Sequence, residues 1–483
     1  MSKTITDIQI LEQLFEDHFG KKPEAVSIIP MSGSDRRYYR LVADKTTAIG
    51  TFNQNIAENN SFYYFTDLFH KHGINVPEIY KTAKDRRYYL QQDLGSVSLF
   101  DALNKEGFTN EIKEYYRMSL EQLAKLQWIA GREADYNQCF GTKQFDEKAI
   151  SADFLYFKYY FADLQKIVYD KTELTDEIEE ISKDLGRIQP KMLMYRDFQS
   201  RNIMLYEGKV YFIDYQGCMQ GPPQYDIASL LWQAKAKLPQ KWKDELLNSY
   251  ITSLNNLPMS KVDEMYLRKG YSQFVMLRLV QVLGAYGFRG LLERKPHFIS
   301  SIAPALHNLE TFLNDNPQIP SYPKLRGLLE KLSSKEIRQQ YETVQANTES
   351  KLKIKVNSFS YKKGGIPKDT SEHGGGFVFD CRGLLNPGRI TEYKKLSGKD
   401  ETVQYYLQTE TKMNDFLEHV NALVDISVDD YLQRDFDSLS INFGCTGGQH
   451  RSVFAAEQIA KHLKAKYKLD VELTHTNEKN WVK

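Results

Sequence analysis

The chain has 483 residues, of which 41% are hydrophobic and 26% are charged, and its formal net charge is +1. This length exceeds one typical hydrophobic core and predicts two or three domains. The balanced charge argues against a general attraction to nucleic acid or anionic membranes. The four cysteines, Cys139, Cys218, Cys381 and Cys445, show no C-x-x-C spacing. They argue against a disulfide scaffold or a zinc site and favour a cytoplasmic location.

Neither a secretory signal nor a membrane span is expected. Residues 1–19 predict an amphipathic helix that carries acids and lacks the apolar centre of a signal sequence. The most apolar later segment, 274–292, is interrupted by Arg278 and Arg289. It therefore predicts a buried or groove-lining helix rather than a membrane-spanning one.

Residues 1–93 predict a small lobe of strands with one helix. The predicted strands are 26–29, 38–42, 47–52 and 88–95, and the predicted helix is 57–72. The turn Ser32-Gly33-Ser34 joins the first two strands, and such a turn can drape backbone N–H groups over ATP phosphates. A plain hairpin turn fits its single glycine equally well.

The third predicted strand, 47–52, contains no lysine for the phosphates, although a cation is needed to offset their charge. Arg36, Arg37 and Arg40 are the nearby candidates, and each fits a solvated charge beside a turn equally well. The fourth strand ends where a hinge between two lobes would offer backbone groups to adenine. The residues expected to bind ATP are Ser32, Gly33, Ser34, Arg37, Gln92, Asp93 and Leu94.

Residues 96–335 predict a helical lobe that contains one stretch with the spacing needed for phosphoryl transfer. Asp197 precedes Asn202 by five positions, and a short apolar strand then leads to Asp214. In such a pattern the first acid accepts the proton of the attacking hydroxyl, and the other two residues hold Mg²⁺ on ATP. An ordinary hairpin with polar loops would explain one acid, but not three such groups in this order.

A hairpin explains how the two metal ligands reach one place. Its predicted strands are 203–206 and 209–213, joined by the turn Glu207-Gly208. After two prolines, Asp226 precedes an apolar run in the position of a helix N-cap. We expect Asp226 to support the catalytic loop and not to act as a catalyst.

Residues 336–350 predict a polar linker, and residues 351–483 predict a small α/β domain with a mostly parallel sheet. Its predicted strands are 352–356, 377–380, 439–443 and 471–474, and its predicted helices are 402–424 and 453–463. The loop 444–452 follows the third strand and combines glycines with His450 and Arg451, which suits an anion. The residues expected to bind a phosphate group are Asp380, Arg382, Asn386, Cys445, Thr446, Gly447, Gly448, His450, Arg451 and Ser452.

The spacing from Cys445 to Arg451 and Ser452 also matches phosphatases that use a cysteine nucleophile. Those enzymes usually carry a histidine where this chain has Gly444, and no general acid can be assigned. The pattern therefore favours phosphate binding over hydrolysis.

Residues 1–335 resemble the aminoglycoside phosphotransferase-like (APH-like) kinases, and among them the anomeric kinases of N-acetylmuramate and N-acetylglucosamine. The matching segments are 34–40, 92–95, 195–197 with Asn202, 213–216, and 221–231. The resemblance implies an α+β bilobal, protein-kinase-like fold, with Asp197 as base and with Asn202 and Asp214 as magnesium ligands. It also implies ATP and Mg²⁺ as cofactors, an amino-sugar substrate, and a role in cell-wall recycling or nucleotide-sugar synthesis. This subgroup also lacks the strand lysine.

Residues 351–483 are similar to the C-terminal domain of RapZ, the RNase adapter protein, through segments 379–387 and 444–452. The resemblance implies a site for an amino-sugar phosphate at Thr446, Gly447, His450 and Arg451, and in some members an RNA partner. This chain has Gly388 where the family often has histidine or an aromatic residue. The nucleotide-binding half of RapZ is replaced by the kinase-like region.

Other functions stay open at this point. One is a kinase for another hydroxyl substrate, such as an aminoglycoside, choline or homoserine, and another is the cysteine phosphatase. A third is an adapter for RNA or protein that uses the kinase fold as a scaffold. Lysines that could contact RNA phosphates, although such runs usually form a solvated strand face, are Lys351, Lys353, Lys355, Lys362 and Lys363.

Overall fold

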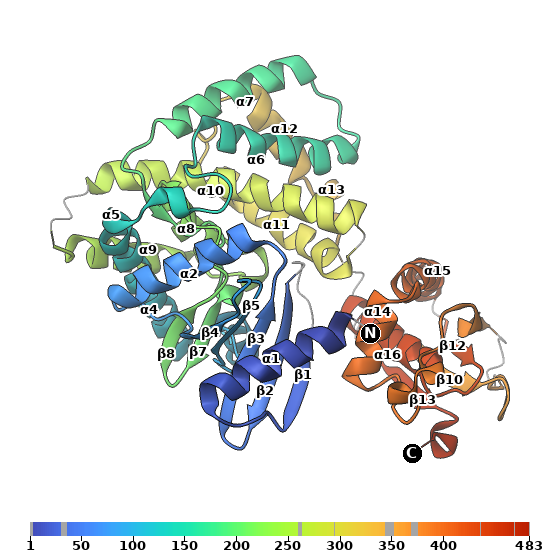
Figure 1. The fold of residues 1–483 in the computed structure, drawn as a ribbon. Helices are drawn as coiled ribbons and strands as arrows, with labels where there is room; N and C mark the ends of the chain where they lie inside the picture. The colour runs from blue at the N-terminus through green and yellow to red at the C-terminus, as the bar shows by residue number, and fades with distance from the viewer. Residues whose placement is uncertain are drawn as a thin grey trace. The chain divides into compact units, whose positions relative to one another are not determined.

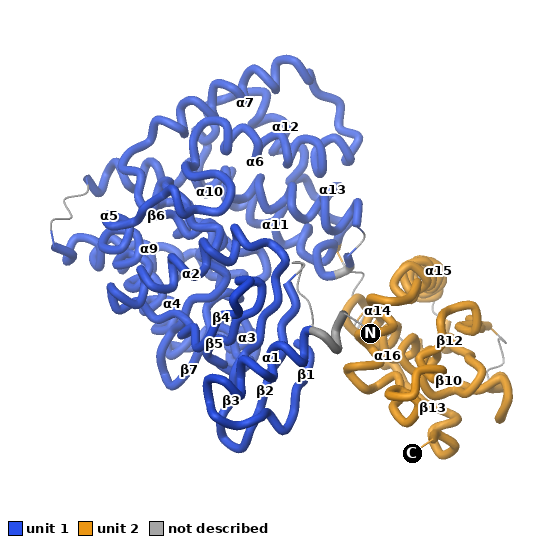
Figure 2. Tube along the Cα trace, viewed as in Figure 1, with its two compact units in different colours: residues 1–341 blue, residues 342–483 orange. Residues whose placement is uncertain are grey.

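The computed structural model describes residues 3–29, 36–258, 263–293, 295–342, 352–368, 375–434, 436–467 and 469–482. The chain divides into two compact units, Met1–Tyr341 and Glu342–Lys483, which Figure 2 shows in different colours. Most of the predicted linker, 343–350, lies outside the described residues. Its first residues belong to the first unit, because Ile337 of α13 (Lys335–Gln339) packs against the core of that unit.

The first unit begins with an antiparallel sheet of order β1-β2-β3-β5-β4 (Figure 1). Its strands are β1 (Ala25–Ile29), β2 (Arg37–Ala43), β3 (Thr46–Phe52), β4 (Ile79–Thr82) and β5 (Tyr88–Gln92). Successive side chains of a strand point to opposite faces. Tyr88 accordingly joins the cluster of α1 (Lys3–Phe19), whereas Tyr89 stacks near Phe62 of α2 (Ile56–Lys71). The two helices therefore cover opposite faces. The predicted strands and helix of this lobe are present, but the fourth predicted strand ends earlier, at Gln92, and β4 was not predicted.

The rest of the first unit is mainly helical, as predicted, and is built around one continuous apolar core. Its helices are α3 (Leu99–Glu106), α4 (Asn110–Lys125), α5 (Gly131–Glu133), α6 (Glu147–Tyr160), α7 (Lys171–Gly186), α8 (Gln224–Leu231), α9 (Gln240–Asn255), α10 (Glu264–Tyr286), α11 (Pro296–Asp315), α12 (Pro323–Leu332) and α13. Two short antiparallel pairs interrupt them: β6 (Met192–Met194) with β9 (Met219–Gly221), and β7 (Ile203–Tyr206) with β8 (Lys209–Phe212). The predicted hairpin is thus present, and its turn residues Glu207 and Gly208 have φ values of 50° and 71°.

Helix α10 overlaps the most apolar 18-residue stretch that the described residues place in a long helix. By length and composition alone, the segment Glu264–Leu292 could cross a membrane, yet 56% of its most apolar window is buried inside the protein. It packs against α6, α8 and α11, which identifies it as a core helix of the lobe. Gly287 permits the approach to α6, because a Cβ there would lie 2.0 Å from the carbonyl oxygen of Tyr160.

The second unit is an α/β domain whose four strands pair in parallel in the order β11-β12-β10-β13. The strands are β10 (Lys353–Ser360), β11 (Gly376–Asp380), β12 (Ser438–Cys445) and β13 (Val471–His475), and the helices are α14 (Glu401–Thr409), α15 (Met413–Gln433) and α16 (Arg451–Tyr467). The predicted sheet is confirmed. The single helix predicted over 402–424 is wrong, because Thr411 interrupts it. Its hydroxyl accepts a hydrogen bond from the backbone N–H of Met413 and so begins a second helix.

Candidate functional site

The loop between β6 and β7 carries Asp197, and the buried carboxylate of Asp226 holds its backbone in place. Asp226 accepts hydrogen bonds from the backbone N–H of Tyr195 at 2.8 Å, from that of Arg196 at 2.9 Å and from Nε2 of Gln127 at 2.9 Å. Asp226 is fully buried, and this burial raises its pKa to about 7. The N-cap prediction is wrong, because α8 starts two residues earlier, at Gln224. Asp226 instead supports the loop from the first turn of the helix.

Arg196 fixes the same loop from its other side. Its guanidinium pairs with both carboxylate oxygens of Asp153 on α6, at 3.0 and 2.7 Å, and lies 4.8 Å from the ring centre of Phe145. Its backbone has a φ of 80°, a conformation that non-glycine residues adopt only where the surroundings impose it. Such strain beside Asp197 is typical of an active-site loop.

Asp197, Asn202 and Asp214 are linked by short hydrogen bonds. Nδ2 of Asn202 donates to the backbone carbonyl of Asp197 at 2.9 Å. The carbonyl of Asn202 accepts the backbone N–H of Ile213 at 3.0 Å, which brings the end of β8 to the loop that carries Asp197. Asp214 follows with a φ of 68°, the second strained residue of this region. The structure therefore brings together the three residues that the spacing singled out.

These donors suit a magnesium ion. Nδ2 of Asn202 is turned to Asp197, so Oδ1 is its remaining ligand atom, and the Asp214 side chain is 43% exposed. Mg²⁺ prefers oxygen ligands and commonly takes only one or two protein groups, together with water and phosphate oxygens. In the described part of the chain no cluster of three or more His, Cys, Asp or Glu side chains forms a closed metal site.

Arg278 reaches the same place from α10. The nearest atoms, Nη2 of Arg278 and Oδ1 of Asp197, lie 3.9 Å apart, and the side chain of Arg278 is only 5% exposed. Nη1 donates to the hydroxyl of Tyr225 at 3.2 Å, and the guanidinium also contacts the ring of that tyrosine. From the sequence, Arg278 was noted only as a charged residue that interrupts an apolar segment. No neighbouring residue indicates its contact with Asp197, which lies 81 positions away.

The residues predicted to bind ATP are only partly brought to this site. Ser32, Gly33 and Ser34 lie outside the described residues. Arg37 turns away, since Nη2 pairs with Asp7 of α1 at 2.9 Å and the guanidinium stacks on Phe52. Arg36, its neighbour, contacts Asp214 instead.

The predicted hinge lies at the end of β5. The carboxylate of Asp93 is occupied, because it accepts Nε and Nη2 of Arg40 at 2.7 and 3.0 Å and the backbone N–H of Gly95. The side chain of Asp93 therefore shapes the hinge. Leu94 is buried beside it, and Oε1 of Gln92 accepts from the backbone N–H of Glu78.

In the second unit, three backbone carbonyls of the loop after β12 accept hydrogen bonds from side chains. The carbonyls of Thr446, Gly447 and Gly448 accept hydrogen bonds from Ser360, Asn477 and Trp481, at 2.8, 2.8 and 2.7 Å respectively. A peptide whose carbonyl is fixed in one direction points its N–H the opposite way. The N–H of Gly448 accordingly donates to Sγ of Cys445 at 3.2 Å, and Oγ of Ser452 lies 3.1 Å from the same sulfur. The loop is therefore arranged to present N–H groups to an anion.

The two cations of this loop are engaged elsewhere. Nη1 of Arg451 donates to the backbone carbonyls of Arg382 and Leu384, at 3.1 and 2.6 Å. His450 contacts the carbonyl of Tyr393 through Nε2 at 2.9 Å, and burial lowers its pKa. One nitrogen of each side chain that was predicted to bind phosphate is therefore occupied by a backbone contact.

The remaining residues of the predicted phosphate set lie after β11. Arg382 pairs with Asp380 through Nε and Nη2, and its guanidinium stacks on Tyr361 at 3.8 Å. Asn386 accepts the backbone N–H of Gly388 and begins a short 3-10 turn. A Cβ at Gly388 would lie 3.1 Å from the ring of His450, so this glycine makes room for the histidine.

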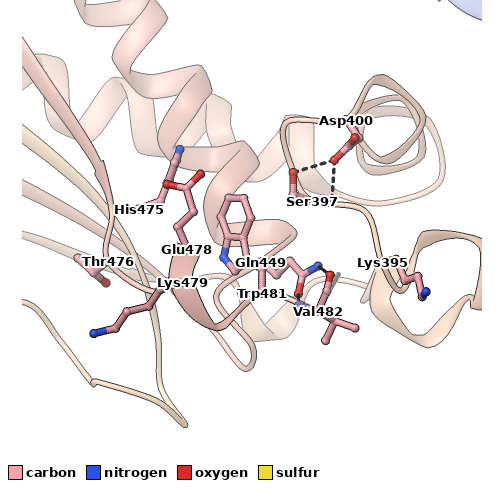
Figure 3. A pocket seen from close by; sticks show the side chains of 10 residues that line it. All are labelled: Lys395, Ser397, Asp400, Gln449, His475, Thr476, Glu478, Lys479, Trp481 and Val482. Carbon is pink, nitrogen blue, oxygen red and sulfur yellow. Dashed lines mark hydrogen bonds between the residues drawn. The ribbon is translucent and has the colours of Figure 1, made fainter.

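Beside the loop lies an open cavity of about 750 Å³ (Figure 3). Lys395 and Lys479 line opposite sides of it, and the indole of Trp481 lies between them. Gln449 is tied by its Nε2 to the carbonyls of Leu396 and Val482. Trp481, which lines the cavity, donates a hydrogen bond to the carbonyl of Gly448, so the cavity borders that side of the loop.

In comparison with known proteins, each unit matches the model of a different family. Residues 26–259 match the model of the phosphotransferase enzyme family, APH, and residues 352–479 match the RapZ C-terminal domain. A nucleotide-binding protein of Cereibacter sphaeroides is 40% identical over 114 residues, which are 24% of this chain and 36% of that protein. Another, from Thermosipho melanesiensis, is 28% identical over 253 residues, 51% of this chain and 75% of that protein.

This chain spans less than half of the length of several curated relatives. Among solved structures, the choline kinase from Cryptosporidium parvum is similar to the chain, with a TM-score of 0.45 and 13% identity. That alignment covers 67% of this chain and 99% of the choline kinase.

Proposed function

We propose that this chain, which joins an APH phosphotransferase domain to a RapZ C-terminal domain, is a cytoplasmic kinase of an amino sugar. It uses ATP and Mg²⁺ and phosphorylates the anomeric hydroxyl of N-acetylmuramate or N-acetylglucosamine, in cell-wall recycling or nucleotide-sugar synthesis. Its second domain senses a phosphorylated amino sugar. The observation that carries the proposal is Asp197, exposed beside Asn202 and Asp214 and faced by the buried guanidinium of Arg278.

Asp197 is the general base of this proposal. Its side chain is 54% exposed, so a substrate hydroxyl can reach it, while Asp226 and Arg196 keep its backbone in one place. Such a base removes the hydroxyl proton as the oxygen attacks, and a positioned base contributes about 10²- to 10⁴-fold to a rate. Mg-ATP, when bound, supplies the phosphoryl group, and Oδ1 of Asn202 and the carboxylate of Asp214 would hold the metal.

The charge around Asp197 supports a neutral or anionic acceptor. The charge of Arg196 is balanced by Asp153, whereas Arg278 is buried with Asp197 as its carboxylate partner. A cationic acceptor such as choline or an aminoglycoside would bring a like charge close to the guanidinium of Arg278, whose side chain is only 5% exposed. A sugar hydroxyl carries no such penalty, which supports a sugar over those alternative acceptors.

The sensor role rests on the loop after β12. Three neighbouring carbonyls are held from behind, so the N–H groups of the loop can face an anion without reorganisation. Arg451 braces the segment after β11 onto this loop and so positions a wall of the site. This arrangement supports binding of a phosphate group and gives no support to hydrolysis by Cys445.

The test is phosphorus NMR of the full chain with ATP, Mg²⁺ and single acceptors: N-acetylmuramate, N-acetylglucosamine, choline and kanamycin. We expect a sugar 1-phosphate signal with an amino sugar, abolished in Asp197→Asn and retained in the matched control Asp176→Asn, an exposed acid on α7. Transfer to choline or kanamycin without transfer to either sugar would overturn the proposed acceptor. No transfer to any of the four, with intact ATP binding, would favour an adapter for RNA or protein.

A further inference from the structure

The guanidinium of Arg36 lies where the strand lobe meets the segment of Asp214. Arg36 is only 8% exposed, and its Nη2 lies 2.8 Å from Oε1 of Glu58 on α2 and 3.3 Å from Oδ1 of Asp214. Nη1 donates to the hydroxyl of Tyr38 at 3.1 Å. Arg36 therefore links Glu58 of α2 to Asp214, the residue proposed as a magnesium ligand. Asp214 lies 178 positions after Arg36 in the sequence.

Strand β3 places no cation near this point. Its buried Thr51 pairs in register with Tyr38 of β2 and Tyr89 of β5, so a short side chain stands between two tyrosines. Kinases need a cation beside the phosphates, and many take it from a strand lysine that pairs with a glutamate of the neighbouring helix. Here Glu58 of α2 is present, and its partner is Arg36, the residue just before β2.

Arg37 and Arg40, the other two arginines close to Arg36 in the sequence, make different contacts. Arg37 pairs with Asp7 on the face covered by α1. Arg40 pairs with Asp93 and donates to the carbonyl of Gly95 at the predicted hinge. Alternation of side chains explains the different contacts of Arg36 and Arg37, because adjacent residues of an extended segment point to opposite faces. Arg36 is the arginine of this group that faces the metal-binding segment.

We infer that Arg36 is the phosphate-binding cation of this kinase and that Glu58 positions it. The inference rests on the proposed function, since it names a residue of the same nucleotide site. A planar guanidinium can contact a carboxylate and a phosphate oxygen at once, which the single ammonium of lysine cannot do in the same way. Glu58 is itself fixed, because its Oε2 accepts Nδ2 of Asn53 at 2.9 Å. The Arg36–Glu58 pair therefore makes nucleotide binding depend on the position of α2.

The experiment measures binding by calorimetry, so it does not depend on turnover. The full chain is titrated with Mg-ADP and with adenosine, in the wild type, Arg36→Met and the control Arg87→Met. Arg87 pairs with Asp85 on an exposed turn of the same lobe. We expect Arg36→Met to weaken Mg-ADP binding about 10- to 100-fold, as the loss of a charge-assisted hydrogen bond does, and to leave adenosine binding unchanged.

Arg36→Met also leaves Glu58 without its cation and can destabilise the lobe. Arg36→Gln is therefore measured in parallel, because its amide still donates to Glu58 but carries no charge, and it should show the same selective loss. Wild-type affinity for Mg-ADP in both variants, or an equal loss for adenosine, would overturn the role of Arg36. A wild type that binds adenosine but not Mg-ADP would overturn the proposed kinase function itself.

Discussion

Replacing Asp226 by asparagine should separate the support of the catalytic loop from catalysis itself. Oδ2 of Asp226 accepts Tyr195 N–H and Gln127 Nε2, and Oδ1 accepts Arg196 N–H. Asparagine keeps one acceptor oxygen and puts an NH₂ group in the place of the other. At least one buried N–H of the loop then faces a donor, which costs about 1–3 kcal/mol of folding free energy.

The effect should depend on pH in a defined direction. Burial raises the pKa of Asp226 to about 7, from about 3.9 in an unfolded chain. Between these values the folded protein binds this proton more tightly than the unfolded protein. The contribution of the group to stability is therefore fully present below about pH 4 and is lost as pH rises through about 7. From pH 5 to pH 8 the loss amounts to about 2–3 kcal/mol.

The assay is urea unfolding of the wild type, Asp226→Asn and the control Asp176→Asn at pH 5, 6, 7 and 8. Asp176 is an exposed acid on α7. The stability difference between wild type and Asp226→Asn should be largest at pH 5 and shrink towards pH 8, whereas the control should follow the wild type throughout. A difference that stays constant with pH would refute the titration of Asp226, and no difference at any pH would refute its role as loop support.

Asp197→Asn should lower kcat by about 10²- to 10⁴-fold, as loss of a general base does, with the calorimetric Kd for Mg-ADP unchanged; a change in Kd instead would place Asp197 among the nucleotide contacts. Arg278→Met should improve binding of a cationic acceptor by about tenfold or more, because two like charges about 4 Å apart repel by about 4 kcal/mol at an effective dielectric constant of 20. Competition by choline in the sugar-kinase assay checks this, and equal competition in wild type and variant would contradict it. Cys445→Ser should leave calorimetric binding of glucosamine 6-phosphate to the full chain intact, because the sulfur accepts a bond from Gly448 that a hydroxyl can also accept. Phosphate release from that sugar by the wild type, lost in the variant, would instead establish a phosphatase.

Local sequence was sufficient for most of the elements and for the order of the polar groups Asp197, Asn202 and Asp214. The spacing from Asp197 to Asn202 and the hairpin that leads to Asp214 depend on neighbours within about twenty positions, and the structure has that hairpin. The parallel sheet of the second unit could also be predicted from the sequence. Alternating apolar strands and helices have few other ways to bury their apolar faces.

The sequence by itself therefore determined two families of structure and a short list of polar residues. Only the tertiary structure decided what those residues touch. The sequence could not distinguish the roles of the three arginines in and just before β2. In the structure Arg37 pairs with Asp7 of α1, whereas Arg36 pairs with Asp214. Arg278 and Asp226 reach the catalytic loop from α10 and α8 because those helices pack beside it, and Arg451 turns to carbonyls that a different loop supplies. Such partners lie tens to hundreds of positions apart, so the fold has to bring them together before their chemistry is visible.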